Sequence, residues 1–290
     1  MIKFNIIGEL KLKTKSIAFL GPLGTNTEQA TIKYDPKATP INCSSINEIF
    51  EMVTTKKADE GMVPIENSID GPVTDTLDIL IHESKLSIQN EIILNISHCL
   101  ITNKNSSEKE SFSEIFSHPQ ALNQCKKFLL AKYPKTKLIA SMSTSEAVKF
   151  VANSTKKIAA IGTDRAAEIY EAQIIAKNIE DNMNNSTRFI VLSHKKTSPS
   201  GNDKTSLCFS FSKDSPGSLY KVLGKFAKRD INLTKIESRP SKNTLGQYVF
   251  LIDLEGHQEE NLIKETLLEV KQEVSELKLF GSYPIDKISK

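Results

Sequence analysis

Polar side chains crowd two short segments of the chain, each next to an apolar run. The segment VPIENSIDG contains Glu66, Asn67 and Ser68 between turn-forming residues, and NNSTRFIVL contains Thr187 and Arg188 directly before an apolar strand. An arginine can bind a carboxylate through two parallel hydrogen bonds, so these groups could hold an acidic substrate. A polar turn explains the first segment equally well, and by composition alone the second is an ordinary loop–strand junction.

A third segment, SHPQALNQC, has the form of a helix start with Pro119 in its first turn. Ser117 and Gln124 are seven residues apart, which is almost two helical turns, so both are predicted to project from one face. Cys125 and Leu129 point elsewhere, toward a core. The shared polar face could line a site, and it could equally be a solvated surface.

Hydroxyl residues mark the starts of several predicted helices. Thr25 with Glu28, and Ser143 with Glu146, have the spacing of a capping box, and Thr144 follows the second cap. Open α/β sheets bind ligands where strands end and helices begin, because helix N-termini offer unpaired N–H groups and the positive end of a dipole. A dianionic substrate would suit such a crevice. Taken singly, each hydroxyl is better explained as an N-cap.

Residue spacing excludes several kinds of site. The turn GPLGT lacks the G-K-[ST] ending of a phosphate loop, and no G-x-G-x-x-G is present, so a nucleotide cofactor is not expected. No His, Cys or carboxylate spacing suits a metal, and His98 and His118 are better explained as structural histidines. The four cysteines are far apart and form no C-x-x-C pair, which argues against a zinc knuckle and a disulfide framework. We therefore expect neither a metal nor a cofactor.

Composition indicates a globular protein that binds neither nucleic acid nor membrane. The formal net charge is +3, from 38 basic and 35 acidic residues that largely interleave. Lysines at positions 3, 11, 13 and 15 lack the arginine and aromatic partners of a nucleic-acid surface, so this start is predicted to be a solvated leader. No apolar run approaches the roughly 20 residues of a membrane span, and the first residues lack the features of a signal peptide. We expect a cytoplasmic protein.

Two patterns of elements follow one another along the chain. From 16 to 194, short apolar runs such as 16–20 and 157–161 alternate with capped helices, which predicts α/β units around a mainly parallel sheet. The polar segment 195–204 has the composition of a linker, and each side of it is expected to have a complete core. Beyond it, strands at 205–211, 232–238, 247–254 and 276–283 flank helices starting at Ser215-Pro216 and at 261. That order, βαββαβ, is the ferredoxin-like unit.

In chain order, these motifs closely resemble the signatures of the prephenate dehydratase family: GPLGT, VPIENS, SHPQALNQC, STSEA, AAIGTDRAA, NNSTRF and INLTKIESRP. The resemblance runs from Ser16 to Tyr283. It implies a catalytic domain of two α/β lobes over 16–194, similar to periplasmic binding proteins. A linker over 195–204 and an ACT regulatory domain over 205–285 would follow.

The resemblance also implies a function. Prephenate would lose carbon dioxide and water to give phenylpyruvate, a carbon–oxygen lyase reaction of L-phenylalanine biosynthesis that needs no cofactor. L-Phenylalanine would act as a feedback effector on a homodimer or homotetramer. Two alternatives stay open: arogenate as the substrate, and a small-molecule sensor without catalytic activity.

The family motifs assign candidate residues by position. The catalytic candidates are Asn67, Ser117, Gln124 and Thr187, and the substrate-binding candidates are Thr25, Glu66, Ser68, Ser143, Thr144 and Arg188. The effector candidates are Pro216, Gly217, Ser218, Leu219, Glu237, Ser238, Arg239 and Pro240. The chain departs from the family at Asn26, where an aromatic residue is usual, and at Ser218, where alanine is usual.

Overall fold

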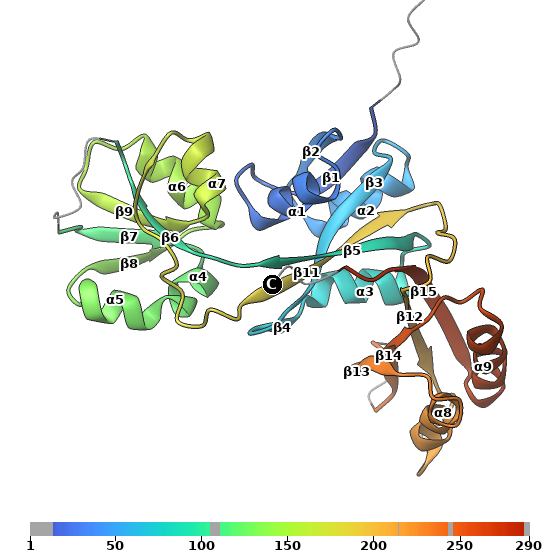
Figure 1. Ribbon diagram of the computed structural model, residues 1–290. Coiled ribbons are helices and arrows are strands. Elements are labelled where there is room, and N and C mark those ends of the chain that lie inside the picture. Colours follow the sequence, from blue (N-terminus) through green and yellow to red (C-terminus); the bar gives the residue numbers. More distant parts are fainter. Residues whose placement is uncertain (1–13, 105–110, 214, 243–245, 287–290) are drawn as a thin grey trace, which may run out of the picture.

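The computed structural model describes residues 14–104, 111–213, 215–242 and 246–286. The chain forms two α/β lobes in a row and a C-terminal domain that packs beneath the first lobe (Figure 1). Lys3, Lys11 and Lys13 of the predicted leader lie outside the described residues. Lys15 is not a freely solvated charge, because its Nζ lies 3.2 Å from Asp35 and 3.0 Å from Glu60.

Lobe 1 is a six-stranded sheet in the order β2-β1-β3-β11-β5, with β4 paired to β3. Helix α1 covers one face, and α2 and α3 cover the other. Its strands are β1 (Ser16–Leu20), β2 (Thr39–Cys43), β3 (Glu60–Asn67), β4 (Gly71–Pro72), β5 (Ser87–Asn95) and β11 (Ser186–Ser193). Its helices are α1 (Asn26–Tyr34), α2 (Ile46–Thr54) and α3 (Thr74–His82).

Lobe 2 is a five-stranded sheet in the order β10-β6-β9-β7-β8. Helices α6 and α7 pack on one face, and α4 and α5 pack on the other. Its strands are β6 (Cys99–Thr102), β7 (Glu114–Ser117), β8 (Lys137–Ala140), β9 (Ile158–Gly162) and β10 (Gln173–Ala176). Its helices are α4 (Pro119–Gln124), α5 (Lys126–Lys132), α6 (Thr144–Ala152) and α7 (Asp164–Ile169).

The prediction of a mainly parallel sheet is wrong, because both sheets are mixed. In lobe 1, β1 runs parallel to β2 and β3, whereas β11 runs antiparallel to both β3 and β5. The chain leaves lobe 1 after β5 and returns as β11, so these two strands lie side by side and connect the lobes (Figure 1). A strand that brings the chain back from a second lobe enters the sheet from the opposite end, which reverses its direction.

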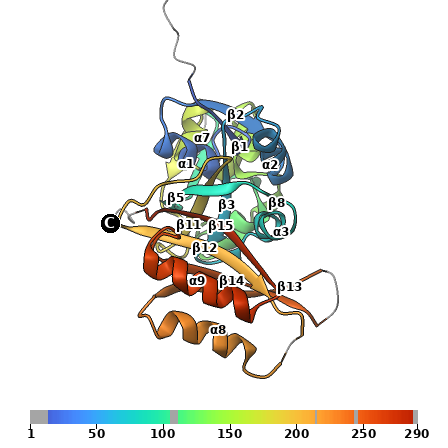
Figure 2. The ribbon, with the colours of Figure 1, turned by 90° about the vertical axis from the view of Figure 1, so that its right-hand side faces the viewer.

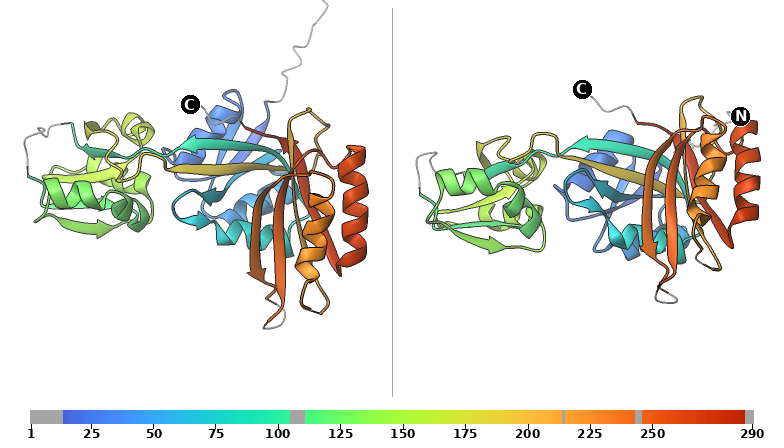
Figure 3. Two further views of the ribbon diagram at one scale, coloured as in Figure 1. Left: turned by 60° about the horizontal axis from the view of Figure 1, so that its bottom comes forward. Right: turned by 90° about the horizontal axis from the view of Figure 1, so that it is seen from below.

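The C-terminal domain has the predicted βαββαβ order. Its sheet has the strand order β13-β14-β12-β15 with antiparallel pairs, and both helices cover the face turned away from lobe 1 (Figures 2 and 3). The elements are β12 (Asp203–Ser210), α8 (Ser218–Ala227), β13 (Leu233–Pro240), β14 (Tyr248–Glu255), α9 (Asn261–Glu273) and β15 (Glu276–Pro284). Helix α8 begins two residues after Pro216, because Gly217 occupies the N-cap with a φ of 84°, a conformation that glycine adopts without steric cost.

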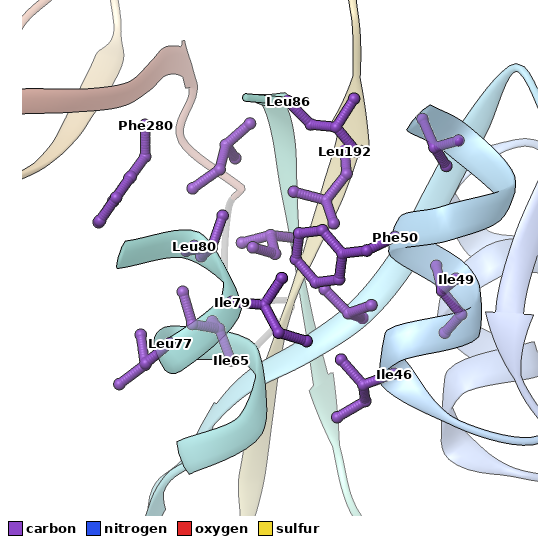
Figure 4. Packing of buried hydrophobic residues seen from close by; sticks show 14 of the residues in the cluster. Ile46, Ile49, Phe50, Ile65, Leu77, Ile79, Leu80, Leu86, Leu192 and Phe280 are labelled. Atoms are coloured by element: carbon purple, nitrogen blue, oxygen red, sulfur yellow. The ribbon is translucent and has the colours of Figure 1, made fainter. Parts of the chain in front are cut away.

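The C-terminal domain has a core of its own between its sheet and its helices, and a second hydrophobic cluster joins it to lobe 1 across the predicted linker. Leu77 and Leu80 of α3 and Leu86 lie in the same buried cluster as Leu251 and Phe280 of the C-terminal sheet, and Figure 4 shows Phe280 beside the α3 side chains. Phe280 and Leu251 are only 3% and 4% exposed. The burial of these side chains stabilises the junction of the two domains.

Backbone contacts bring the two domains still closer. A Cβ on Gly281 of β15 would lie 2.4 Å from the carbonyl oxygen of Ile88 in β5, so only glycine allows this approach. The predicted linker is itself packed, since Thr197 donates to the Ser282 carbonyl and Asp203 is 3% exposed. Within the described part of the chain, no helix is long and apolar enough to cross a membrane.

Candidate active site

A cleft of about 830 Å³ lies between the two lobes. Lobe 1 contributes the loop before α1, the start of α2, Asn67 at the end of β3 and Thr187 at the start of β11. Lobe 2 contributes His98, His118, Gln124 and the first residues of α6. Both lobes therefore form one site, as expected when ligands bind where strands end and helices begin.

The N-termini of three helices line this cleft, together with Glu48 and Glu146 of their first turns. Thr25 caps α1 by accepting from the Glu28 N–H, and Ser143 caps α6 by accepting from the Glu146 N–H at 3.0 Å. Both caps and Thr144 line the cleft, together with Ile46 at the start of α2. Among the described residues that line it, none is a lysine or an arginine. An acidic ligand would be held by helix dipoles and free N–H groups, so capping and ligand binding are compatible roles here.

Asn67 and Thr187 form the centre of the lobe 1 wall. They are directly paired across β3 and β11, and the Asn67 Nδ2 donates to the Thr187 Oγ1 at 2.9 Å. The backbone N–H groups of Ile69 and Asp70 donate to the Asn67 Oδ1, which fixes the orientation of this amide. Thr187 thus accepts a hydrogen bond and keeps its own proton for a ligand, since the structure gives this hydroxyl no acceptor among the described residues.

Gln124 forms the centre of the lobe 2 wall. Its Nε2 donates to the Asp70 Oδ2 at 2.6 Å, which joins the lobes, and Gln120 donates to the same oxygen. Its Oε1 lies 2.8 Å from the His98 Nε2 and accepts from the Asn185 Nδ2 at 3.0 Å. The structure thus brings together three of the four catalytic candidates: Asn67, Gln124 and Thr187.

Ser117 and Ser68 do not reach the cleft. Ser117 is the last residue of β7 and fully buried, and its Oγ donates to the Ile161 carbonyl at 2.7 Å. The helical spacing argument fails because α4 starts only at Pro119, so Ser117 and Gln124 do not share a helix. Ser68 donates to the Asn184 carbonyl and accepts from the Ser186 N–H, which ties the β3–β4 turn to β11.

Arg188 points to the face of β11 opposite Thr187, so the prediction that it clamps a substrate carboxylate is wrong. Side chains alternate along a strand, and the Arg188 guanidinium lies 2.7 Å from Glu91 and 2.6 Å from Asp253. It also donates to the Tyr283 hydroxyl. Arg188 therefore joins lobe 1 to the C-terminal domain.

Glu66 lies in the same junction, so the prediction that it binds the substrate is also wrong. Its carboxylate lies 3.1 Å from the Lys235 Nζ of β13 and 3.8 Å from Arg188. Burial alone would raise the pKa of the Asp253 carboxyl, but Arg188 and the Ser206 hydroxyl outweigh it and lower that pKa. The charged form of Asp253 is thus stabilised inside the junction.

The effector candidates divide between the N-terminal end of α8 and strand β13. Gly217, at the N-cap of α8, leaves open space around its Cα, since a Cβ there would meet nothing within 4 Å. Glu237 and Arg239 lie on the half-buried side of β13 and pair with each other, and Arg239 also pairs with Asp78 of α3 at 3.4 Å. Ser238 and Pro240 alternate with them on the exposed side. Pro216 precedes Gly217 in the turn, and Ser218 and Leu219 are the first two residues of α8.

Sequence patterns did not single out His98, Asp70 or Asn185 as site residues. His98 was interpreted as structural, yet it lines the cleft and is 3% exposed. Asn185 is fully buried and directly precedes the segment STRF. Asp70 lies in the motif VPIENSIDG, and Asn185 lies in NNSTRFIVL. Their places in these motifs could have identified both as site residues. Among the described residues, no group of three or more His, Cys, Asp or Glu side chains could hold a metal.

The chain matches two protein families and is similar to known proteins over most of its length. Residues 17–197 match the family model "Prephenate dehydratase", and residues 209–272 match the model "ACT domain". The prephenate dehydratase of Methanocaldococcus jannaschii is 40% identical over 279 residues, covering 93% of this chain and 98% of that protein. A bifunctional chorismate mutase/prephenate dehydratase of Aquifex aeolicus is 42% identical, covering 95% of this chain and 74% of that protein.

A solved structure agrees with these matches over both domains. The prephenate dehydratase of Arthrobacter aurescens, in complex with L-Phe, has a TM-score of 0.86 and is 32% identical. The alignment covers 93% of this chain and 90% of that one. The family resemblance of the sequence motifs is thus confirmed, and the chain belongs to the prephenate dehydratase family, with an ACT domain at residues 209–272.

Proposed function

We propose that this protein converts prephenate to phenylpyruvate, with loss of carbon dioxide and water. One observation carries the proposal: Thr187 lines a cleft walled by helix N-termini, its oxygen accepts from Asn67, and no residue that the structure describes accepts its hydroxyl proton. This arrangement fits a substrate with two carboxylates and a hydroxyl leaving group. Family membership supplies the identity of that substrate.

The reaction is a fragmentation that yields an aromatic ring. The ring carboxylate leaves as carbon dioxide, its bonding electron pair enters the ring, and the ring hydroxyl departs from the opposite carbon. Departing hydroxide must gain one proton, which comes ultimately from the solvent, to become water. Thr187 would donate a hydrogen bond to the departing oxygen, and the N-termini of α1, α2 and α6 would bind the carboxylates. Such assistance to a leaving group is typically worth about 10²–10⁴ in rate.

We further propose that L-phenylalanine regulates the enzyme through the ACT domain. The solved relative from Arthrobacter aurescens was crystallised with L-Phe, and the open backbone at Gly217 would let a carboxylate approach the N-terminus of α8. Thr187 and Arg188 are neighbours on β11, one facing the cleft and the other bound to Asp253 of the ACT sheet. A shift of that sheet would therefore act on the strand that carries Thr187.

A homodimer or homotetramer stays part of the proposal. Strand β13 is at the edge of the ACT sheet and carries Ile236, which is 50% exposed, and Tyr220 of α8 is 79% exposed. An open strand edge and exposed apolar side chains favour association with a second copy. A cytoplasmic location is also proposed, in keeping with four buried cysteines that are all free thiols.

The deciding experiment offers prephenate and arogenate separately to wild type and Thr187→Val and follows the aromatic product. Prephenate turnover is expected in the wild type, with kcat lowered at least about 10²-fold in Thr187→Val. The valine is nearly isosteric, so equal melting temperatures serve as the folding control. Turnover of arogenate alone would change the substrate, and absence of turnover with both compounds would favour a sensor.

A further inference from the structure

We infer that Asn185 and His98 are positioning residues of the dehydratase reaction, because they fix the groups that leave the Thr187 proton free. The inference rests on the proposed function. Five polar side chains form one continuous chain across both lobes, in the order His98, Gln124, Asn185, Asn67 and Thr187. The first four are each at most 8% exposed, so water competes little for their hydrogen bonds.

The direction of every bond in this chain is determined from its two ends. At one end, the N–H groups of Ile69 and Asp70 require the Asn67 oxygen, so its Nδ2 faces Asn185 and Thr187. At the other end, the Asp70 carboxylate accepts from the Gln124 Nε2, so the Gln124 oxygen faces His98 and Asn185. Carboxylates can only accept and backbone N–H groups can only donate, so neither amide can be reversed.

Asn185 joins these two fixed amides and satisfies both. Its Oδ1 accepts from the Asn67 Nδ2 at 2.8 Å, and its own Nδ2 donates to the Gln124 Oε1 at 3.0 Å. A side chain with two acceptors would face the Gln124 oxygen with another acceptor, and a side chain with two donors would face the Asn67 nitrogen with another donor. Either contact would be repulsive. The position therefore requires a neutral amide, with oxygen toward lobe 1 and nitrogen toward lobe 2.

His98 completes the lobe 2 end. Because the Gln124 Oε1 carries no hydrogen, the His98 Nε2 at 2.8 Å must be the donor, which fixes the protonated ring nitrogen. The backbone N–H of His98 donates to Glu180, which anchors the residue where the chain enters lobe 2. His98 thus acts on the reaction through Gln124 by holding its amide toward Asn185.

The experiment compares Asn185→Asp with Asn184→Asp, its exposed neighbour, in the full-length protein with prephenate as substrate. Aspartate at 185 can still accept from Asn67 but presents a second acceptor to the Gln124 oxygen. We expect kcat to fall about 10- to 100-fold, the effect of one lost buried hydrogen bond in the transition state. KM should change less than about threefold, because the substrate-facing helix N-termini are untouched. The Asn184 control should stay within about twofold of wild type.

A second pair of variants tests His98 independently. His98→Leu removes the donor and should lower kcat about 10-fold, whereas His98→Gln places an amide donor near the same point and should recover most of the rate. In a Thr187→Val background, His98→Leu should cost less than about twofold more, because residues acting as one unit are not additive.

Several outcomes would overturn the inference. It fails if Asn185→Asp matches its control, if His98→Gln is as slow as His98→Leu, or if the His98 and Thr187 losses simply multiply. Should Asn185→Asp not fold, the His98 pair and the combined variant decide. Absence of prephenate turnover in the wild type would refute the proposed function and the inference together, whereas normal wild-type turnover with unaffected variants would refute the inference alone.

Discussion

Replacing Arg188 by methionine tests how the two domains are held together. The Arg188 guanidinium lies between the carboxylates of Glu91 and Asp253, which are 0% and 6% exposed. Methionine keeps much of the apolar volume of the arginine stem and removes the charge. Lys204 still pairs with Glu91 at 2.8 Å, while Asp253 keeps its bond from the Ser206 hydroxyl. Asp253 then has no direct ion-pair partner among the residues that the structure describes.

The buried ion pair determines how much stability Arg188→Met is expected to lose. Removing one partner of a buried ion pair costs about 3–5 kcal/mol, because the remaining charge is left uncompensated. Each kcal/mol shifts the melting temperature by about 2 °C in a chain of this length. We therefore expect Arg188→Met to melt about 6–10 °C below the wild type at pH 7.

The difference in stability between Arg188→Met and the wild type should become smaller as the pH falls. In the wild type the Asp253 pKa is lowered from its usual value, so its contribution to stability persists down to about pH 4 and is lost only below that. Without Arg188, burial, the largest single influence on this carboxyl, would raise the pKa. A raised pKa makes the charged form destabilising near pH 7, so the variant should recover toward the wild type as the pH falls from 7 toward the usual aspartate pKa of about 4.

Calorimetry on the full-length protein measures these shifts, and Arg188→Met with Asp253→Asn is the matched control. The double variant removes one positive and one negative charge, and the asparagine can still bond to Ser206. It should melt at least about 3 °C above the single variant. A single variant within about 2 °C of the wild type, or a double variant no more stable than the single one, would refute the reasoning.

Three further outcomes are expected. A chain ending at Thr197 should aggregate or melt well below full length in size-exclusion and thermal measurements, because it exposes Leu80 and Leu86 that pack against Phe280; a stable and active truncated monomer would contradict the shared cluster. Turnover should survive chelation and exhaustive dialysis, and activity restored only by a divalent ion would contradict this. Calorimetry should show that the wild type binds L-phenylalanine and that Ser218→Leu binds it at least about 10-fold more weakly. Undiminished affinity in Ser218→Leu would contradict an effector site at the turn that contains Gly217.

Local patterns identified elements where the deciding contacts lie within a few residues. Thr25 and Ser143 cap α1 and α6, as their spacing to a following glutamate predicts, because each cap bonds to a backbone N–H three residues later. The βαββαβ order of the last domain followed from strand and helix periodicity in the same way. Motif order over both domains also sufficed to identify the family.

Which side chains face the cleft depends on contacts between residues that are distant in the sequence, and the motifs do not reveal these contacts. Thr187 and Arg188 are adjacent in one motif, and alternation along a strand puts them on opposite faces, but only the packed sheet shows which face is the cleft. Ser117 is a second example of a residue whose surroundings the motif did not reveal. It ends β7 and does not belong to α4, and its hydroxyl donates to the Ile161 carbonyl and does not reach the cleft.

By itself, the sequence determined the family, the capped helices and three polar side chains that meet in the cleft: Asn67, Gln124 and Thr187. The tertiary structure alone decided the mixed direction of the strands and the hydrophobic cluster shared between lobe 1 and the ACT domain. It also decided that His98 and Asn185 are hydrogen-bonded to Gln124 in the wall of the cleft. The physical reason is that caps and periodicity depend on hydrogen bonds between near neighbours. Burial, ion pairing and the direction of a side-chain hydrogen bond depend instead on partners that lie tens of residues away, such as Asn185 to Gln124.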